Sequence, residues 1–363
     1  MTEHVHISIE NQIGCITLDR PKALNSLSLQ MIRDITETLL AWRDDADISA
    51  VLIRSSSEKA FCAGGDIRFF YDIGNATPRG GSALIEDFFS EEYALNHLIH
   101  HYPKPYIALM DGVVMGGGMG VAQAGPASRL RIVTERTKMA MPEVNIGLFP
   151  DVGGGYFLSR CAGQLGTYLG VTGEVITAAD ALYTGLADVF VPSAQLPLLT
   201  ARLLAGDGIA VRSAVRDFAA GFSAAIAPDA SMLATNRAAI DRHFGLDTVP
   251  AIIKSLELDA APFAQKTLAA MQKRSPLMMC VTLEQIRRSA ALSVADCLRM
   301  ERSMVRHCFE QGEVIEGVRA MVVDKDNAPQ WNPSTLAAVT PDLIAGFFAP
   351  PWPPHAHPLR SLS

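Results

Sequence analysis

The sequence predicts an α/β fold in which parallel strands alternate with helices and a mostly helical C-terminal region follows. Strand-like and helix-like apolar patterns alternate between residues 5 and 110, and two glycine-rich stretches directly follow strand-like segments. From about residue 201 onward, the apolar spacing is mostly that of helices. Strands that alternate with helices form parallel β-α units, so we expect the intervening loops to gather at one edge of a sheet.

The first two predicted elements are a β-hairpin and a helix. Residues 5–9 and 15–18 have strand-like sequence, with a turn at 11–14 between them. A helix is expected from Ser28, because apolar residues then recur at helical spacing; these are Leu29, Ile32, Ile35, Leu39 and Trp42.

Further strands and helices are predicted along the rest of the chain. We expect strands at 50–54 and 106–110 and a helix at 83–101. Residues 177–180 form a capping-box pattern that opens a helix, and Gly185 fits its end. Two amphipathic helices are predicted to begin at the serines Ser275 and Ser293.

The length of 363 residues favours a large core with an appended region. We place a core that carries the active site at residues 1–200 and a mostly helical region at 201–347. Residues 348–363 are rich in proline, which excludes regular structure, so this tail is expected to be loose.

Composition excludes several classes of partner. The net charge of −7 argues against nucleic acid as a partner, because neutralising phosphates needs a basic face. The longest apolar runs are too short to cross a bilayer, and the N-terminus has no signal or transit pattern, so a cytoplasmic location and no membrane partner are expected. The six cysteines are scattered and are expected to be reduced. No metal site is expected, because the adjacent His100 and His101 cannot share a helix face.

Three segments carry the candidate chemistry: residues 60–67, 111–120 and 141–155. The two glycine stretches lack the spacing of phosphate-binding and dinucleotide-binding loops. Glycine lets backbone N–H groups approach a ligand, and two such groups converging on one oxygen form an oxyanion hole. The third segment supplies Glu143 and Asp151, and chemistry at a carbonyl needs carboxylates beside such a hole.

These segments resemble the crotonase (enoyl-CoA hydratase/isomerase) superfamily. Its A-F-x-A-G-x-D pattern stands at residues 60–66, its G-x-x-x-G-G-G pattern at 112–118 and its P-E-x-x-x-G pattern at 142–147. The resemblance implies a spiral of β-β-α units. Within the superfamily, residues 141–157 and 316–331 are most similar to the 3-hydroxyisobutyryl-CoA hydrolases, and this similarity runs from about residue 5 to 347.

The resemblance implies a role for each matching residue. The N–H groups of Gly65 and Gly117 would hold the thioester oxygen, and Glu143 and Asp151 would be the catalytic carboxylates. The other positions are expected to bind the substrate: Glu92 in the acyl pocket, Lys22 and Ala23 at the CoA nucleotide, and Ala63 and Asp66 in the first glycine loop. No cofactor is implied, since coenzyme A is part of the substrate.

The implied activity is hydrolysis of 3-hydroxyisobutyryl-CoA, an intermediate of valine breakdown, or of 3-hydroxypropionyl-CoA. Hydratases carry a second catalytic glutamate where this chain has Gly120, which speaks against hydration. Enoyl-CoA hydration or isomerisation stays open as an alternative, as does a non-catalytic CoA-binding protein. A homo-oligomer is one expected state, since crotonases often form trimers, but dimers and monomers also stay open.

Overall fold

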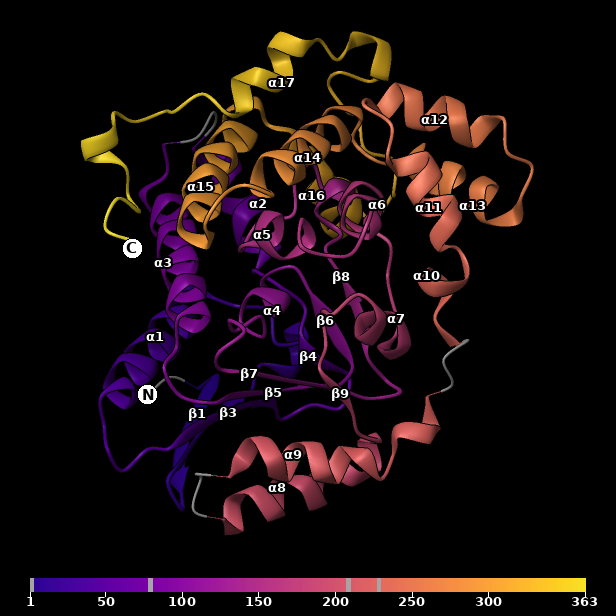
Figure 1. Cartoon of the computed structure of the whole chain (residues 1–363). Coiled ribbons are helices and arrows are strands. Elements are labelled where there is room, and N and C mark those ends of the chain that lie inside the picture. Colours follow the sequence, from indigo (N-terminus) through magenta and orange to yellow (C-terminus); the bar gives the residue numbers. More distant parts are fainter. Residues whose placement is uncertain (1–2, 78–80, 207–209, 227–229) are drawn as a thin grey trace. The chain divides into compact units, whose positions relative to one another are not determined.

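The computed structural model describes residues 3–77, 81–206, 210–226 and 230–363 (Figure 1). The chain forms two compact units that interleave along the sequence. The first unit comprises Met1–Gly65, Ala94–Ala140 and Val175–Thr235, and the second comprises Asp66–Tyr93, Met141–Glu174 and Asn236–Ser363. Each region predicted from the sequence, with boundaries at residues 200 and 347, is one continuous stretch of chain, whereas each of these units combines three separate stretches.

The first unit contains a six-stranded sheet. Its strands, in spatial order, are β1 (Val5–Glu10), β2 (Ile13–Leu18), β3 (Ala50–Ser55), β5 (Tyr106–Met110), β7 (Arg129–Val133) and β9 (Val189–Phe190). β1 and β2 form the predicted antiparallel hairpin, and every other neighbouring pair is parallel. Asn11 and Gln12 make the turn with φ values of 45° and 67°, as a tight hairpin turn requires.

A smaller parallel sheet in the same unit positions the glycine loops. It consists of β4 (Ala60–Cys62), β6 (Val113–Met115) and β8 (Lys138–Ala140). Along the chain, each of these strands follows a strand of the large sheet and precedes a helix or helical turn: α2 (Ile67–Ala76), α4 (Gly117–Gly120) or η2 (Glu143–Asn145). This repeat confirms the predicted crotonase-like spiral of β-β-α units.

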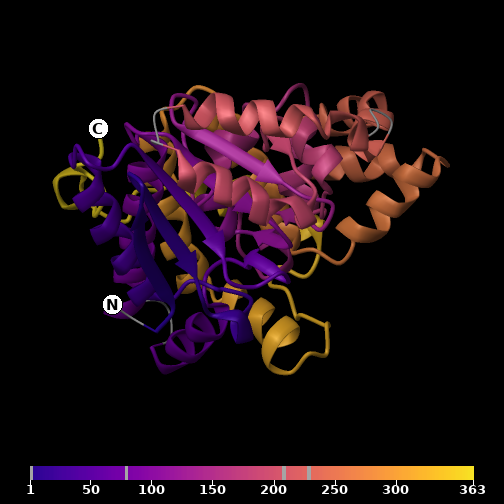
Figure 2. The same cartoon turned by 90° about the horizontal axis from the view of Figure 1, so that it is seen from below.

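Two helices cover one face of the large sheet. α8 (Leu196–Ala205) and α9 (Val211–Ala220) lie below the sheet in Figure 1 and across its strands in Figure 2. Their apolar faces meet the sheet in one buried core cluster, which includes Leu52, Ile107, Ile132, Leu199 and Val215. The burial of these side chains holds the sheet and the two helices together.

The predicted helix starts are confirmed by their caps. Ser28 accepts the N–H of Met31 at 3.2 Å and opens α1 (Leu29–Arg43). Thr177 and Asp180 form the capping box of α7 (Ala178–Tyr183), and Gly185, with φ +73°, follows the end of that helix. The predicted helix at 83–101 is α3 (Ala83–His100), which contributes residues to both units.

The second unit is helical. Besides α2 it contains α5 (Gly154–Leu158), α6 (Leu165–Thr172), α11 (Arg237–Phe244), α12 (Val249–Glu257), α13 (Pro262–Met271), α14 (Pro276–Ser289), α15 (Val294–Gln311), α16 (Glu313–Val318) and α17 (Pro341–Phe347). The serines Ser275 and Ser293 cap α14 and α15 as predicted. In the described part of residues 201–347, every regular element is a helix, which confirms the predicted helical C-terminal region.

The proline-rich tail at 348–363 was expected to be loose; in the structure it packs on α15. The ring of Trp352 faces the guanidinium carbons of Arg302 and Arg306 at 4.8 and 5.1 Å. Arg299 donates to the carbonyl of Leu359 at 3.1 Å, and the Leu359 side chain is buried. Proline limits regular structure here to the short 3₁₀ helix η8 (Pro354–Ala356), but it leaves aromatic and apolar side chains free to pack.

Candidate active site

The two glycine loops meet within the first unit. β4 and β6 run parallel, so the loops that follow them leave the small sheet at the same edge. Gly64 has φ +101°, and a Cβ added there would lie 3.1 Å from the carbonyl oxygen of Met115 and 3.4 Å from the nitrogen of Gly117. A Cβ on Gly118 would lie 2.1 Å from the carbonyl oxygen of Cys62. Only glycine permits this close approach of the two loops.

The two amides predicted to bind the thioester oxygen belong to these loops. Gly117 is the first residue of α4, and the first N–H groups of a helix have no acceptor within it. Gly65 directly follows the tightly packed Gly64. In the described residues, neither N–H group has a hydrogen-bond acceptor. An oxyanion hole needs two unpaired donors of this kind, and the assignment of Gly65 and Gly117 to the thioester oxygen stays a prediction.

Asn25 anchors a further loop to the first glycine loop, and sequence reasoning did not single it out. The side chain is fully buried, and its amide nitrogen donates to the carbonyls of Ala60 and Phe61 at 3.2 and 3.1 Å. It also donates to the hydroxyl of Ser55 at 2.7 Å. Its φ is 57°, a conformation that asparagine tolerates better than most residues. The residue type was therefore the one sequence signal for this role.

The anchored loop carries Lys22 and Ala23, which were predicted to contact the CoA nucleotide. Both lie in the short 3₁₀ helix η1 (Pro21–Ala23), and Lys22 is exposed. The next residue, Leu24, accepts the N–H of Ala63 at 3.0 Å. The structure therefore brings the loop that carries Lys22 and Ala23 next to Ala63.

Asp66 has a structural partner in the second unit. Its carboxylate caps α2 by accepting the N–H of Phe69 at 3.2 Å. An acidic cap stabilises a helix N-terminus, so the presence of an aspartate here has a local explanation. Substrate contact by Asp66 stays a prediction.

The carboxyl groups of Glu92, Glu143 and Asp151 form a buried cluster within the second unit. Their residues are 2%, 5% and 5% exposed. The hydroxyl of Tyr93 donates to Asp151 Oδ2 at 2.7 Å. Among the described residues, Glu92 Oε1 and Glu143 Oε2 have no hydrogen-bond partner. Buried carboxyl oxygens are costly to leave unpaired, and a polar ligand at this cluster would remove that cost.

The three carboxyl groups differ in acidity. Burial raises the pKa of Asp151 to about 6, and the hydrogen bond from Tyr93 opposes that rise. Burial raises the pKa of Glu143 well above its usual range, and the charge of Asp151 adds to the rise. The pKa of Glu92 is raised well above its usual range by the same two causes, burial first. Because the charges of these groups interact, the cluster loses its protons as a coupled set.

Glu301 and Gln285 hold the loop that carries Asp151. The carboxylate of Glu301, which is fully buried on α15, accepts the N–H groups of Gly153 and Gly155 at 2.8 and 2.9 Å. Gln285 donates to the carbonyl of Pro150 at 2.7 Å and to Glu301 at 3.2 Å. This network fixes the backbone on both sides of Asp151.

The same loop stores backbone strain. Val152, the residue after Asp151, has φ +52°, which is a genuine outlier for a β-branched side chain. Such a conformation persists only where neighbouring contacts enforce it, and the bonds from Glu301 to the following glycines do so. Glu301 lies 150 residues along the chain from Asp151, so no local sequence pattern pointed to it.

The comparisons with known proteins decide the family. The family model described as enoyl-CoA hydratase/isomerase matches residues 13–348. The chain belongs to the enoyl-CoA hydratase/isomerase family.

Within this family, the chain is similar to proteins named 3-hydroxyisobutyryl-CoA hydrolase, mitochondrial. The one from Danio rerio is 41% identical over 338 residues, which cover 93% of this chain and 87% of the relative. The one from Homo sapiens is 37% identical over 350 residues, which cover 95% of this chain and 88% of the relative. The family resemblance predicted from the motifs is therefore confirmed.

Solved structures of the family share the whole fold. A carnitinyl-CoA dehydratase from Mycobacterium thermoresistibile is 40% identical, with a TM-score of 0.88 over 97% of this chain and 98% of its own. An enoyl-CoA hydratase from Rhodobacter sphaeroides is 36% identical, with a TM-score of 0.84 over 96% and 98%. The relatives thus carry hydrolase, dehydratase and hydratase names, so the reaction of this family member depends on the chemistry of its own site.

The residues that the structure describes contain no group of three or more His, Cys, Asp or Glu that could hold a metal ion. Within that same part of the chain, no helix has both the length and the apolar character needed to span a membrane.

Proposed function

We propose that this member of the enoyl-CoA hydratase/isomerase family hydrolyses the thioester of 3-hydroxyisobutyryl-CoA, with 3-hydroxypropionyl-CoA as a second substrate. The observation that carries the proposal is the buried pair of Glu143 and Asp151, with Asp151 oriented by Tyr93. The relatives at about 40% identity that are named 3-hydroxyisobutyryl-CoA hydrolase support the choice of substrate. Gly120 at the position of the second hydratase glutamate supports hydrolysis over hydration.

The first requirement of thioester hydrolysis is to stabilise an oxyanion. Attack on the thioester carbon moves negative charge onto the former carbonyl oxygen. We assign the N–H groups of Gly65 and Gly117 to that oxygen, because both lack an internal acceptor in the described residues. Each donor contributes about 3 kcal/mol of transition-state stabilisation, which is roughly 100- to 1,000-fold in rate.

The second requirement is a nucleophile and a proton for the leaving thiolate. Glu143 either activates a water molecule that attacks the thioester carbon, or attacks that carbon itself and forms an anhydride that water then hydrolyses. In both cases Asp151 delivers a proton to the sulfur as the carbon–sulfur bond breaks. The reaction therefore starts with the charge on Glu143 and the proton on Asp151. The two carboxyl groups titrate as a pair, and attack requires the state in which Glu143 carries the charge and Asp151 the proton.

The pH dependence of kcat/KM follows from this proton count. The pair is active with one proton and one negative charge. As the pH rises through about 6, the pair loses its first proton and activity increases. At higher pH the second proton leaves, and activity falls again, since none remains for the thiolate. We expect a bell-shaped profile, measured as initial rates across the pH range.

Replacing Tyr93 by Phe is expected to move the acid limb of this profile to higher pH. The hydrogen bond from Tyr93 lowers the pKa of Asp151, so its loss raises that pKa. The measurement is kcat/KM against pH for both proteins. Tyr102→Phe is the matched control, because the buried Tyr102 hydroxyl donates to the carbonyl of Leu39 instead. An unshifted acid limb in Tyr93→Phe means that Asp151 does not control activity.

A thiol-release assay separates the proposed reaction from its alternative. Hydrolysis of 3-hydroxyisobutyryl-CoA frees one thiol per turnover, which a thiol dye detects, and leaves enoyl absorbance unchanged. Hydration or dehydration changes enoyl absorbance and frees no thiol. Two similar structures are named as a dehydratase and a hydratase, which is why these reactions are the alternative to be tested. Enoyl turnover without thiol release contradicts the proposal. If both signals are absent, a CoA-binding protein without activity is favoured.

The acyl group is tested with a substrate panel. We expect faster turnover of 3-hydroxyacyl-CoAs than of unbranched acyl-CoAs that lack the 3-hydroxyl. Equal turnover would remove the substrate proposal and leave thioester hydrolysis intact. Single turnover in heavy-oxygen water distinguishes the two forms of attack, because label enters Glu143 first only where its carboxylate bonds to the acyl carbon.

The proposal extends to assembly and location. A homo-oligomer stays a prediction from the family resemblance, and light scattering of the purified chain tests it. The cytoplasmic location likewise stays a prediction, whereas the similar hydrolases carry mitochondrial names. Cell fractionation distinguishes the two locations.

A further inference from the structure

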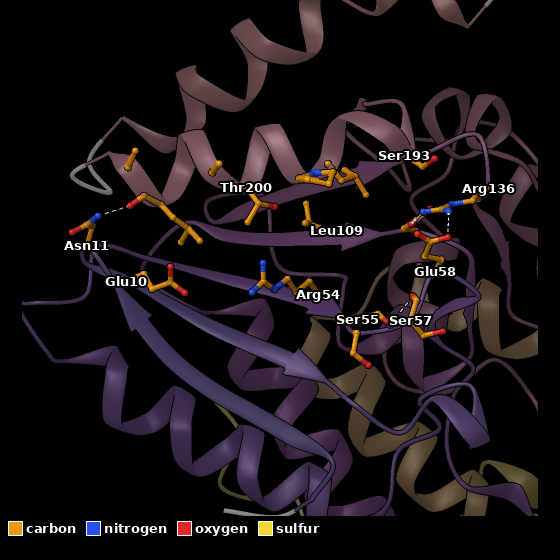
Figure 3. A pocket seen from close by; sticks show the side chains of 17 residues that line it. Glu10, Asn11, Arg54, Ser55, Ser57, Glu58, Leu109, Arg136, Ser193 and Thr200 are labelled. Carbon is orange, nitrogen blue, oxygen red and sulfur yellow. Dashed lines mark hydrogen bonds and ion pairs between the residues drawn. The ribbon is translucent and has the colours of Figure 1, made fainter.

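A second pocket lies in the first unit, between α8 and the large sheet (Figure 3). Its volume is about 760 Å³, which is within the range of small-molecule sites. The ends of β1, β3 and β5 and one face of α8 line it, and none of the predicted active-site residues does. The reaction proposed above leaves this pocket without a role.

Arg54 gives the pocket a cation without an anionic partner. This half-buried residue on β3 donates from Nε to the hydroxyl of Thr17 at 3.2 Å. No carboxylate of the described residues forms an ion pair with its guanidinium. Figure 3 shows the side chain of Arg54 inside the pocket. A partly desolvated guanidinium favours an anion that accepts from its two free nitrogens.

Thr200 supplies a second, independent polar group. It lies on α8, is 8% exposed and lines the same pocket. Its hydroxyl has no hydrogen-bond partner among the residues that the structure describes. In Figure 3, Thr200 projects from α8 on the side of the pocket opposite the sheet strand that carries Arg54. A ligand hydroxyl in the pocket would replace water as the hydrogen-bond partner of this side chain.

The acidic residues around the pocket are either paired or exposed. Asp111 accepts from Arg136 Nε at 2.9 Å and from Thr134 at 2.7 Å. Glu58 binds Arg136 at 2.8 Å, with its own side chain 82% exposed, and Glu10 is exposed. These acids limit the pocket to a ligand with a single negative charge, since a polyanion would be repelled.

The rest of the pocket is apolar. Leu109 from β5 and Leu196 and Leu204 from α8 line it beside Arg54. Inorganic phosphate would leave this apolar surface uncovered, whereas an aliphatic acid covers it and gains from its burial. We infer that the pocket binds a short aliphatic carboxylate, with the carboxylate on Arg54, the carbon chain on the leucines and a ligand hydroxyl on Thr200.

The pocket is linked to the loop that carries Lys22. Ser55 follows Arg54 on β3, and its hydroxyl accepts from the side chain of Asn25 at 2.7 Å. Asn25 in turn holds that loop to β4 through the carbonyls of Ala60 and Phe61. A bound carboxylate that shifts the end of β3 changes the position of this loop. This consequence rests on the proposed function: the ligand alters KM for the acyl-CoA and leaves kcat unchanged.

Titration calorimetry on the full chain tests the pocket without using activity. Isobutyrate and 3-hydroxyisobutyrate are the probes, with the neutral isobutanol and inorganic phosphate as comparisons. We expect both carboxylates to bind, and Arg54→Gln to weaken both by about 10- to 100-fold. Arg43→Gln is the matched control, since Arg43 is an exposed arginine of the first unit that pairs with Asp44 outside the pocket. Unchanged affinity in Arg54→Gln, preference for phosphate or binding of isobutanol alone overturns the inference.

A second variant guards against a change in folding. Thr200→Val keeps the shape of the side chain and removes its hydroxyl, so it should weaken 3-hydroxyisobutyrate and leave isobutyrate unaffected. If Thr200→Val weakens the binding of both ligands, or of neither, the assigned orientation is contradicted. Inhibition kinetics then test the link: isobutyrate should change KM in the wild-type protein and not in Arg54→Gln. A KM that isobutyrate leaves unchanged overturns the link, while the calorimetric result decides the pocket separately from the proposed function.

Discussion

Replacing Glu143 by Gln is expected to lower kcat for thioester hydrolysis by about 100- to 10,000-fold, the range that a positioned acid or base contributes. The amide can neither attack the acyl carbon nor take a proton from water. The same change is expected to leave the fold intact at neutral pH. The amide matches the carboxyl group in size, and burial raises the pKa of Glu143, which favours the neutral form that the amide resembles.

Thiol release and thermal unfolding of the variant check this result. Glu284→Gln is the matched control, because Glu284 lies on α14, forms an i,i+4 ion pair with Arg288 and is partly exposed. The control is expected to keep the wild-type kcat. A Glu143→Gln variant with wild-type kcat would remove Glu143 from the reaction.

Replacing Glu301 by Ala is expected to produce the largest loss of stability, about 2–6 kcal/mol in the free energy of unfolding, since each orphaned buried N–H group costs about 1–3 kcal/mol. The change leaves the buried N–H groups of Gly153 and Gly155 without their acceptor and takes one partner from Gln285. The Val152 backbone then loses the contacts that enforce its strained conformation. Asp151 moves with this loop, and a shift of about 1 Å costs roughly 100-fold in rate.

Denaturant unfolding and kcat measure the two effects. Glu301→Gln keeps one acceptor oxygen and is expected to fall between the wild type and Glu301→Ala in both. Glu310→Ala, on the same helix but partly exposed and paired with Arg306, should cost at most about 1 kcal/mol. Equal stability of Glu301→Ala and Glu310→Ala would show that Glu301 does not hold the Asp151 loop.

Much of the fold followed from local patterns in the sequence. The hairpin, the caps at Ser28, Ser275 and Ser293, and the capping box at Thr177 depend on residues a few positions apart, so their signals are visible along the chain. The meeting of the glycine loops also followed, because parallel strands place the loops after them at one edge.

The residues that orient the site were not predictable in this way. Glu301 and Gln285 reach the Asp151 loop from α15 and α14, far along the chain, and neither belongs to a short motif. Tyr93 adjoins Glu92, which the family resemblance placed in the acyl pocket, yet its bond to Asp151 depends on tertiary packing. The docking of the tail was missed because proline content reports on backbone regularity and carries no information about the packing of Trp352.

The central claim is that Glu143 and Asp151 act as one catalytic unit on the thioester. The most direct test is kcat for thiol release by Glu143→Gln, Asp151→Asn and the double variant. Residues that share one step are non-additive, so the double variant should be no slower than the slower single variant. Losses that multiply in the double variant would show that the two carboxylates act independently and would contradict the account.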